Sequence, residues 1–347
     1  MSSLIELQRY ELTARLGDPR RDFEIVELPV QVRVCPLTGR RARITPARIK
    51  GETLREDVWP DVTEAVEASR ANCPFCPEAT ARTTCTFDEA RFGFRRLTRG
   101  EALLFPNLAP YGPYSAVTII GHEHYCEVGA FDPARYADAF KLSRDYLRGV
   151  LARDESVRTM AITQNHLPAS GGTLVHPHLQ VQADAVAPSF PALLWDSLAA
   201  FHARTGAGFW DELLALERRL GERIAGRTGG WTWLTMWAPQ GMLEVWGVHD
   251  GPPTVATLTD DAVDELVAGL LTVQRWYKTQ CKNSFNFGLY LRRDDMPGAR
   301  LACRILARNS WQAYGRSDRS FYELVLGEQV LDSAPEEWAS LLLPTFT

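Results

Sequence analysis

The chain has 347 residues, of which 45% are hydrophobic and 23% are charged, and its formal net charge is −5. This composition is typical of a soluble globular protein, and the weakly acidic balance indicates neither a nucleic-acid partner nor an anionic membrane. The apolar runs are too short to cross a bilayer, and the first residues show no secretory signal. Seven scattered cysteines do not indicate a disulfide framework. We therefore expect a cytoplasmic protein without nucleic-acid or membrane partners.

The first half is expected to contain an N-terminal arm, two strand pairs and one long helix. The first thirty residues mix charged and apolar residues without a clear period. A hairpin is expected over 34–49 around the turn Pro36–Gly39, and a knuckle rich in Cys and Pro over 72–78. Strands are expected at 102–105 and 114–120, a helix with Asp132 as its N-cap at 133–151, and strands at 158–164 and 174–182.

The second half repeats this order of elements. Helices are expected at 211–224 and 260–279, and strands at 231–237, 242–248, 285–292, 302–307 and 321–326. Because the order strand pair, helix, strand pair occurs twice, we predict an α+β fold with two similar halves, 1–185 and 186–347. Each half would have a mainly antiparallel sheet flanked by helices.

The segment Thr173–Gln180 carries the main functional signal, because it contains His176, His178 and Gln180. Side chains alternate along an extended strand, so these three are expected to form a polar row on one side of it. A neutral imidazole can bind a metal or attack phosphorus, and a Gln amide can donate a hydrogen bond to a phosphoryl oxygen. A pair of structural histidines on a half-buried strand is the simpler alternative.

A metal site is indicated by Cys73-Pro-Phe-Cys76, whose spacing lets one turn supply two thiolates to a tetrahedral ion. A redox pair would normally open a helix inside a βαβ unit, and the sequence shows no such unit. Zinc would need two further ligands, for which His122 or His124 and His176 are the candidates.

If His176 faces the metal, His178 remains as a nucleophile for the α-phosphate of a nucleotide. The product would be a covalent nucleotidyl-histidine, which splits one transfer into two steps. Gln180 would stabilise the charge on a phosphoryl oxygen. The turn formed by Gly171, Gly172 and Thr173 allows the backbone to approach an anion closely.

These residues also carry a resemblance to a known family. His176-Pro-His178-Leu-Gln180, preceded by Asn165 and a Gly-rich loop, resembles the galactose-1-phosphate uridylyltransferase branch of the histidine-triad superfamily. That branch includes ADP-glucose phosphorylase and diadenosine tetraphosphate phosphorylase. Further matching pieces are Pro36–Gly39 followed by Thr45–Arg48, the Cys73–Cys76 knuckle and the Phe105-Pro-Asn107 loop.

The resemblance implies two histidine-triad-like halves, of which only the first keeps the metal and catalytic histidines. It implies one structural zinc site and a nucleotidylated His178, and Gln180 in place of a third histidine marks the transferase branch. It also implies that Asn107 lies near the ribose, Asn165 near the phosphates and Arg48 on a phosphate. The implied zinc ligands are Cys73, Cys76, His124 and His176.

Two departures separate the chain from the uridylyltransferases proper. No histidine follows His249, and the segment Leu301–Arg304 stands where a pair of metal-binding histidines would be expected, so no second metal is expected. Leu108 follows Asn107 where those enzymes have an acidic residue for the ribose.

Together these patterns predict a nucleotidyltransferase or phosphorylase that acts on a nucleoside diphosphate sugar or a related nucleotide. The acceptor would be a sugar phosphate or inorganic phosphate, and a homodimer is possible. One alternative is a nucleotide hydrolase of the histidine-triad type, against which Gln180 argues. Another is a zinc-stabilised nucleotide-binding protein without turnover, against which the presence of both His178 and Gln180 argues.

Overall fold

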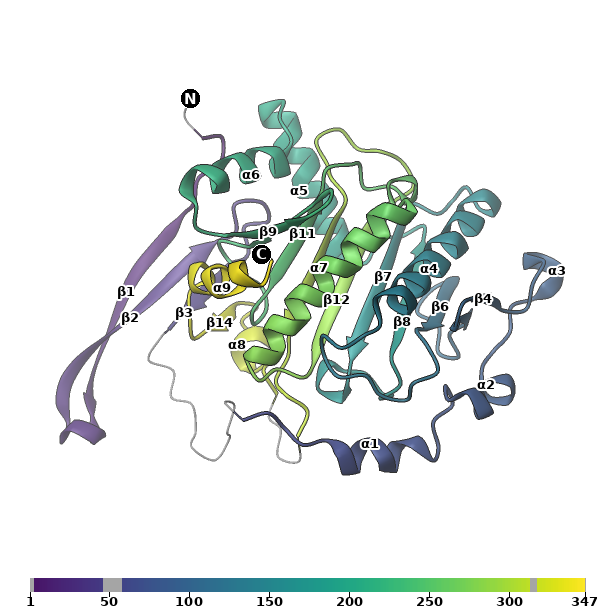
Figure 1. Cartoon of the computed structure of the whole chain (residues 1–347). Coiled ribbons are helices and arrows are strands. Elements are labelled where there is room, and N and C mark those ends of the chain that lie inside the picture. The colour runs from purple at the N-terminus through teal and green to yellow at the C-terminus, as the bar shows by residue number, and fades with distance from the viewer. Residues whose placement is uncertain (1–2, 46–57, 313–316, 347) are drawn as a thin grey trace.

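The structure is a computed structural model that describes residues 3–45, 58–312 and 317–346. Within these residues, antiparallel neighbours form a ten-stranded sheet in the order β4-β5-β6-β8-β7-β12-β13-β11-β10-β9 (Figure 1). Its strands are β4 Leu97–Arg99, β5 Ala102–Pro106, β6 Tyr114–Ile119, β7 Thr159–His166, β8 His178–Asp184, β9 Ile224–Thr228, β10 Trp231–Thr235, β11 Val245–His249, β12 Phe285–Arg292 and β13 Ala302–Ala307. The predicted α+β class with mainly antiparallel sheets is confirmed.

Pairing of β7 with β12 joins the two halves of the chain into this one sheet. The strands on one side of that pairing all precede residue 185, and those on the other side all follow it. A second sheet, ordered β1-β2-β3-β14, contains β1 Arg9–Asp18, β2 Glu24–Val34, β3 Arg41–Ile44 and β14 Gln329–Leu331. The small sheet therefore links both ends of the chain, and the division at residue 185 stays a prediction.

Two long helices cover one face of the large sheet. The helix α4 (Pro133–Arg153) begins after Asp132, whose side chain accepts a hydrogen bond from the Arg135 amide, as predicted for an N-cap. The helix α7 (Asp260–Thr279) lies beside α4 in Figure 1 and matches the predicted range. Both helices bury their apolar side chains against the sheet, where the main core lies.

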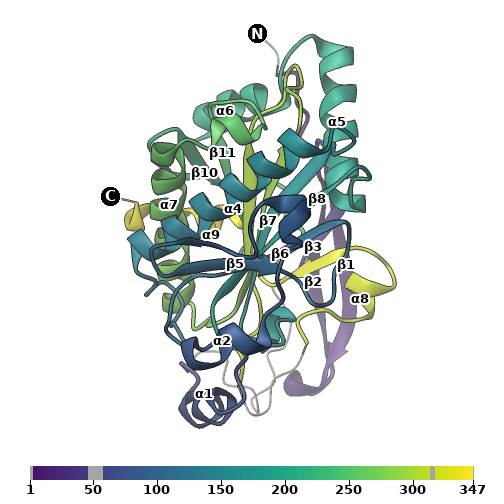
Figure 2. The same ribbon diagram turned by 90° about the vertical axis from the view of Figure 1, so that its right-hand side faces the viewer.

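On the opposite face, α5 (Ser189–Thr205) and α6 (Phe209–Leu220) cover the C-terminal half. Figure 2 shows α7 and α5 on opposite sides of the sheet. The remaining helices are short: α1 Thr63–Arg70, α2 Pro77–Thr83, α3 Glu89–Phe92, α8 Phe321–Leu324 and α9 Pro335–Leu342. The N-terminal half of that face, against which Phe75 packs, holds the start of β8 and His178.

The N-terminal arm is a long hairpin of β1 and β2 that extends away from the body of the molecule (Figure 1). Its register places one apolar row, from Tyr10 to Leu16 and from Val26 to Val32, on a single face of the hairpin. The expected arm is therefore present, and only the expectation that it has no period is wrong. The period of two is present in the sequence, but it is interrupted at the turn by the charged run Asp18–Asp22.

Three further predictions differ from the structure. The segment 321–326 contains the helix α8 and no strand, because Ser320 and Glu323 form a capping box that starts a helical turn. The strand predicted at 174–182 starts only at His178, because Pro177 has no amide hydrogen for the sheet. The predicted helix 211–224 ends at Leu220, where Gly221 adopts a left-handed conformation.

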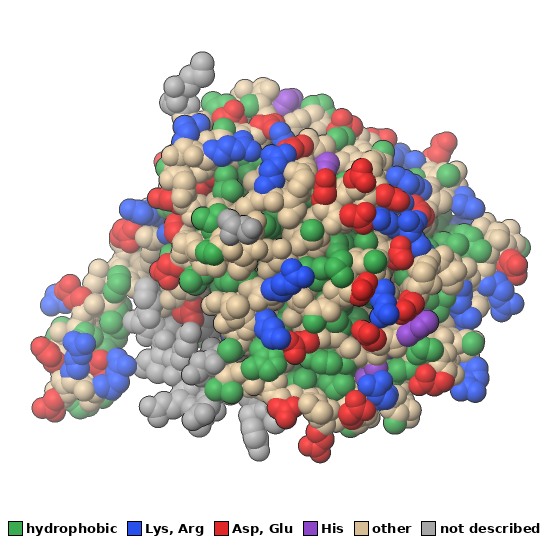
Figure 3. Space-filling model, viewed as in Figure 1, with side chains coloured by type: hydrophobic (Ala, Val, Ile, Leu, Met, Phe, Trp, Pro, Cys, Tyr) green, Lys and Arg blue, Asp and Glu red, His purple; other side chains and the backbone are tan. Residues whose placement is uncertain are grey.

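Basic and acidic side chains are interspersed over the face shown in Figure 3. No helix of the described residues combines the length and the apolar character needed to cross a bilayer.

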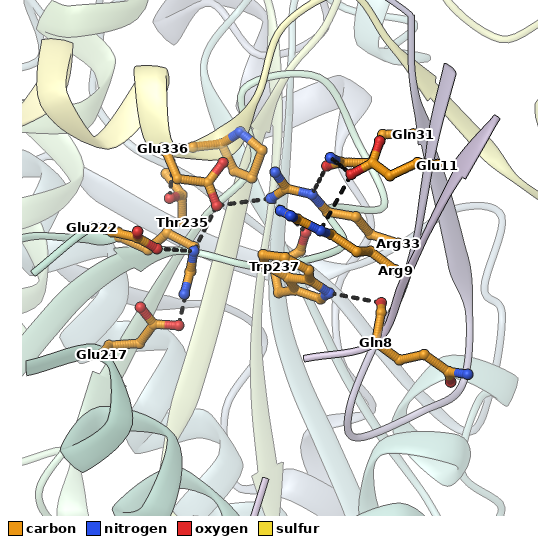
Figure 4. A network of polar contacts seen from close by, with 12 residues as sticks. Gln8, Arg9, Glu11, Gln31, Arg33, Glu217, Glu222, Thr235, Trp237 and Glu336 are labelled. Atoms are coloured by element: carbon orange, nitrogen blue, oxygen red, sulfur yellow. Dashed lines mark hydrogen bonds and ion pairs between the residues drawn. The ribbon is translucent and has the colours of Figure 1, made fainter. Parts of the chain in front are cut away.

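A buried charge network connects the small sheet to the C-terminal helix (Figure 4). The Arg223 guanidinium donates to Glu217 at 2.8 Å and to Glu336 at 2.6 Å, and Glu336 also accepts from Arg33 at 2.8 Å. The Arg33 guanidinium lies 4.0 Å from the centroid of the Trp237 ring. Because the Arg223 side chain is fully buried and that of Glu217 is 1% exposed, these charges depend on one another for compensation.

Removing only Arg223 from this network is expected to destabilise the protein strongly. The change Arg223→Met leaves the Glu217 carboxylate buried without its partner, which costs about 3–5 kcal/mol in free energy of unfolding. The double change Arg223→Met with Glu217→Leu should recover much of that loss, because neither charge is then buried. Urea denaturation measures both effects, with Arg227→Met as a control because Arg227 forms only exposed contacts. Equal stability of the Arg223→Met variant and the control would contradict the expectation.

Candidate metal centre and reactive histidine

The knuckle between α1 and α2 presents two thiols to the interior. The Cys73 amide donates to Arg70 at the end of α1, and Cys76 is the N-cap of α2, which starts at Pro77. Both cysteines are buried, with exposed fractions of 6% and 3%. The tight turn therefore directs two sulfur atoms to one point, as the C-x-x-C spacing predicted.

The structure brings Cys73, Cys76, His124 and His176 together. One ligand atom from each of the four lies within 4.8 Å of all the others, and all four side chains are buried. The Cys76 sulfur is 3.4 Å from Nδ1 of His124 and 3.7 Å from Nδ1 of His176, and the Cys73 sulfur is 3.7 Å from Nδ1 of His176. Tetrahedral zinc with ordinary Zn–S and Zn–N bond lengths would separate sulfur from nitrogen by about 3.6 Å. The four donors thus fit one tetrahedral ion.

Hydrogen bonds to the other ring nitrogens fix the tautomers that a metal requires. Nε2 of His176 lies 2.9 Å from the Gly121 carbonyl oxygen, which can only accept, so Nε2 carries the proton. Nε2 of His124 lies 2.8 Å from the Ser69 hydroxyl, which already donates to a backbone carbonyl and must accept here. In both rings the unprotonated Nδ1 faces the sulfurs, which is the arrangement of an oriented metal ligand. Burial lowers the pKa of His176 to about 4, so the neutral ring is favoured.

His122, the other candidate for the third ligand, lies outside this group. Its side chain is 63% exposed, and its Nδ1 is 3.7 Å from a carboxylate oxygen of Glu101. Of the two residues left open by the spacing, the structure therefore groups His124 with the cysteines.

His178 lies at the start of β8, next to the metal group but not in it. Its Nδ1 is 2.8 Å from the His176 carbonyl oxygen and must donate to it, so the lone pair is on Nε2. The Phe75 ring, from the cysteine knuckle, contacts the His178 ring edge to face at 5.3 Å. Burial lowers the pKa of His178, which favours the neutral imidazole. This residue is thus held as a neutral ring with one unprotonated nitrogen, as a nucleophile requires.

An apolar wall lies beside His178 on the same face of the sheet. His178 pairs with Ile119, and Gln180 pairs with Val117 on β6 and with Thr163 on β7. Directly paired residues project to one face, so Gln180 follows His178 along this face. Phe105, Val117 and Ile119 form a separate buried cluster with Phe75 and Leu103 packed against it.

Sequence reasoning missed a polar chain on the other side of His178. Asn165 on β7 accepts a hydrogen bond from the Asn286 amide at 2.6 Å, and Asn286 accepts from Arg308 at 2.8 Å. Arg308 also forms two 2.7 Å hydrogen bonds with Asp318. In the sequence, Asn286 is a single polar residue between Phe285 and Phe287 on a predicted strand. That position alone could have indicated a polar group on this face of the sheet.

The other candidate residues have different positions. The Asn107 side chain accepts from the Ala109 amide at 3.1 Å and shapes the turn after β5. Gly171 has a φ of +89°, and a Cβ on Gly172 would lie 3.3 Å from the Leu167 carbonyl oxygen, so the loop requires glycine at the first and is tight at the second. Thr173 follows in the same loop, which leads to β8. Arg48 lies outside the described residues.

His166, which borders this loop in sequence, is not available to a ligand. Its side chain is only 1% exposed and stacks on Phe285, with ring centroids 4.9 Å apart. From its position on β7 it faces the helix layer, away from His178.

Comparison with known proteins identifies relatives of the whole chain. No protein-family model matches it. An uncharacterized protein from Archaeoglobus fulgidus is 30% identical over 316 residues, which cover 91% of this chain and 92% of that protein. The structure of an ADP-glucose phosphorylase from Arabidopsis thaliana with bound ADP-glucose has a TM-score of 0.68 at 16% identity, over 90% of this chain and 98% of that one. A uridylyltransferase structure has a TM-score of 0.63 at 16% identity, over 91% and 98% of the two chains.

Proposed function

Because this chain belongs to one family with the Archaeoglobus fulgidus protein and has the fold of the galactose-1-phosphate uridylyltransferase-like branch of the histidine-triad superfamily, we propose that it is a nucleotidyltransferase or phosphorylase that works through His178. One observation carries the proposal. The Nδ1 proton of His178 is donated to the His176 carbonyl, so the lone pair lies on Nε2, on the same sheet face as Gln180.

The proposed reaction has two displacements at the α-phosphorus of a nucleoside diphosphate sugar or a related nucleotide. In the first, the Nε2 lone pair forms the N–P bond, the P–O bond to the leaving group breaks, and a phosphate-terminated product departs with the bonding electrons. In the second, an oxygen of the acceptor phosphate attacks the same phosphorus and the N–P bond breaks. The His176 carbonyl holds the Nδ1 proton throughout and compensates the positive charge that develops on the ring.

Gln180 suits this reaction better than a hydrolysis. Its amide can donate to a non-bridging oxygen of the transferred phosphoryl group, but it cannot deliver a proton to a leaving group or activate water as a histidine would. A leaving phosphate needs no such proton. The alternative of nucleotide hydrolysis would need that missing acid or base, and binding without turnover would not need a nucleophile with its tautomer fixed.

Zinc is the proposed occupant of the Cys73, Cys76, His124 and His176 group, and its role is structural. Four protein ligands complete a tetrahedron and leave no open position for substrate. The ion would tie the knuckle to the residue that precedes β8, and so would fix Phe75 against the reactive ring. A cytoplasmic location and a homodimer remain predictions from the sequence.

Intact-mass measurement after incubation with nucleoside diphosphate sugars and dinucleoside polyphosphates tests the proposed function. We expect one donor to add the mass of a nucleoside monophosphate, and we expect a phosphate acceptor to remove it. The size of the increment identifies the base. The absence of both an adduct and nucleotide exchange with every donor in the panel would overturn the proposal.

A further inference from the structure

We propose that Arg304 and Arg40 form an anion subsite that binds the phosphate group of the acceptor or leaving group, on the C-terminal half of the same sheet face as His178. The assignment of this anion to a substrate rests on the proposed function. The two arginines would bind a phosphate group of the substrate that His178 does not contact.

Strand register places Arg304 in one row with Gln180. Arg304 on β13 pairs with Gly288 on β12, Gly288 pairs with Thr163 on β7, and Thr163 pairs with Gln180. Directly paired residues share a face, so all four project from the same side of the sheet. With neighbouring strands 4.7–4.9 Å apart, the Cα atoms of Arg304 and Gln180 are separated by about 14 Å.

The strip between these two residues has small side chains. Gly288 has none, and a Cβ at this position would lie 3.1 Å from the Tyr290 hydroxyl, which therefore reaches over it. The row lies on the β12 side of β8, whereas Asn107 and the apolar wall lie on the β5 side. If the nucleoside of a substrate lies against the apolar wall, the rest of that substrate molecule extends along this strip toward Arg304.

The Arg304 guanidinium is oriented by its neighbours. It lies 3.9 Å from the centroid of the Phe190 ring, at the start of α5, and its Nε donates to the Tyr290 hydroxyl at 2.8 Å. Its side chain is 19% exposed. A guanidinium has five N–H donors, and within the described residues only this one hydrogen bond is found, so its terminal nitrogens can bind an anion without a rearrangement.

The carboxylate near Arg304 does not form a close ion pair with it. Glu244 is 3.9 Å from Nη1 of Arg304 and already accepts from Trp246 Nε1 at 2.5 Å and from the Gln240 amide. Arg40, in the turn between β2 and β3, adds a second positive charge beside this carboxylate, because Gln240 donates both to Glu244 and, through its side chain at 3.3 Å, to the carbonyl of the adjacent Arg41. Burial and the charge of Arg304 both lower the pKa of Arg40. Its guanidinium has no hydrogen bond or ion pair within the described part of the chain. Two arginines and one carboxylate leave a net positive charge that a phosphate would neutralise.

Calorimetric titration with inorganic phosphate at constant ionic strength tests the subsite on the full chain. We expect Arg304→Gln and Arg40→Gln to weaken phosphate binding by about 10- to 100-fold, because each removes a charge-assisted contact. The control Arg300→Gln should bind like the natural protein, because Arg300 precedes the same strand but is paired with Asp211 and Asp250. Arg304→Lys keeps the charge without the planar fork and should bind with intermediate affinity.

The titration separates this inference from the proposed function. His178→Ala should still bind phosphate at the subsite, even if no nucleotidyl adduct ever forms on the natural protein. Unchanged phosphate affinity in both Arg304→Gln and Arg40→Gln, or no phosphate binding by the natural protein, would overturn the subsite. Loss of binding in His178→Ala alone would place the phosphate at the histidine and would also overturn it.

Discussion

Alanine at position 178 is expected to abolish nucleotidyl transfer. The His178→Ala change removes an imidazole whose lone pair is fixed in direction and does not face the metal group, whereas the rings of His124 and His176 face the cysteine sulfurs. Loss of a nucleophile that acts with its surroundings as a unit lowers the turnover rate by roughly 10⁴-fold or more. The measurement is exchange of labelled phosphate into the nucleotide donor, together with the mass of the protein after incubation with that donor.

The variant His122→Ala serves as the matched control, because His122 is an exposed histidine near the same site. It should keep the full exchange rate and the full adduct mass. The His178→Ala protein should keep its melting temperature, so that loss of activity cannot be assigned to unfolding. An exchange rate within tenfold of the natural protein in His178→Ala would show that the reactive group lies elsewhere.

The long amphipathic elements could be predicted from the sequence because their pattern is local. α7 follows from the apolar spacing of Val263, Leu266, Leu270 and Val273, and its observed bounds match the predicted ones. β12 and β13 are likewise observed at the predicted bounds, because their β-branched and aromatic residues are enclosed by turn residues.

Elements whose stability depends on the rest of the fold were not predicted. Phe190 and Trp195 of α5 pack against strands that are far away in sequence. The apolar pattern within α5 therefore does not show that this helix covers a sheet face. The pairing of β14 with β3 connects residues nearly three hundred positions apart. Local apolar content was also misleading at 321–326, where a capping box determines a helical turn instead of a strand.

The candidate site was predictable where adjacent residues carry its chemistry. The C-x-x-C spacing and the His176-Pro-His178 sequence were sufficient to propose a metal group and a nucleophile beside it. Between His122 and His124 the resemblance favoured His124, but only the fold shows which ring faces the sulfurs. Asn286 and Arg304 were beyond reach, because their relation to His178 arises from the pairing of β7 with β12 and of β12 with β13.

Loss of the metal is expected to have the largest effect on stability. Cys76→Ser removes the sulfur that lies within 3.7 Å of both histidine nitrogens, and the metal content of the purified protein should fall from one zinc per chain to nearly none. Structural zinc supplies about 10–16 kcal/mol of apparent binding free energy in isolated zinc-finger peptides. Even a third of this would lower the melting temperature by roughly 5–7 °C in a chain of this size.

Elemental analysis and thermal unfolding measure the two effects, and Cys85→Ser is the matched control because Cys85 is a half-buried thiol outside the metal group. That control should keep both its zinc and its melting temperature. In Cys76→Ser the knuckle is no longer tied to His176, so Phe75 loses its fixed position against the reactive ring and adduct formation on His178 should slow as well. A Cys76→Ser protein with full zinc content would contradict the ligand set, whereas a zinc-free protein with unchanged stability would show that the buried thiols and imidazoles hold the knuckle without an ion.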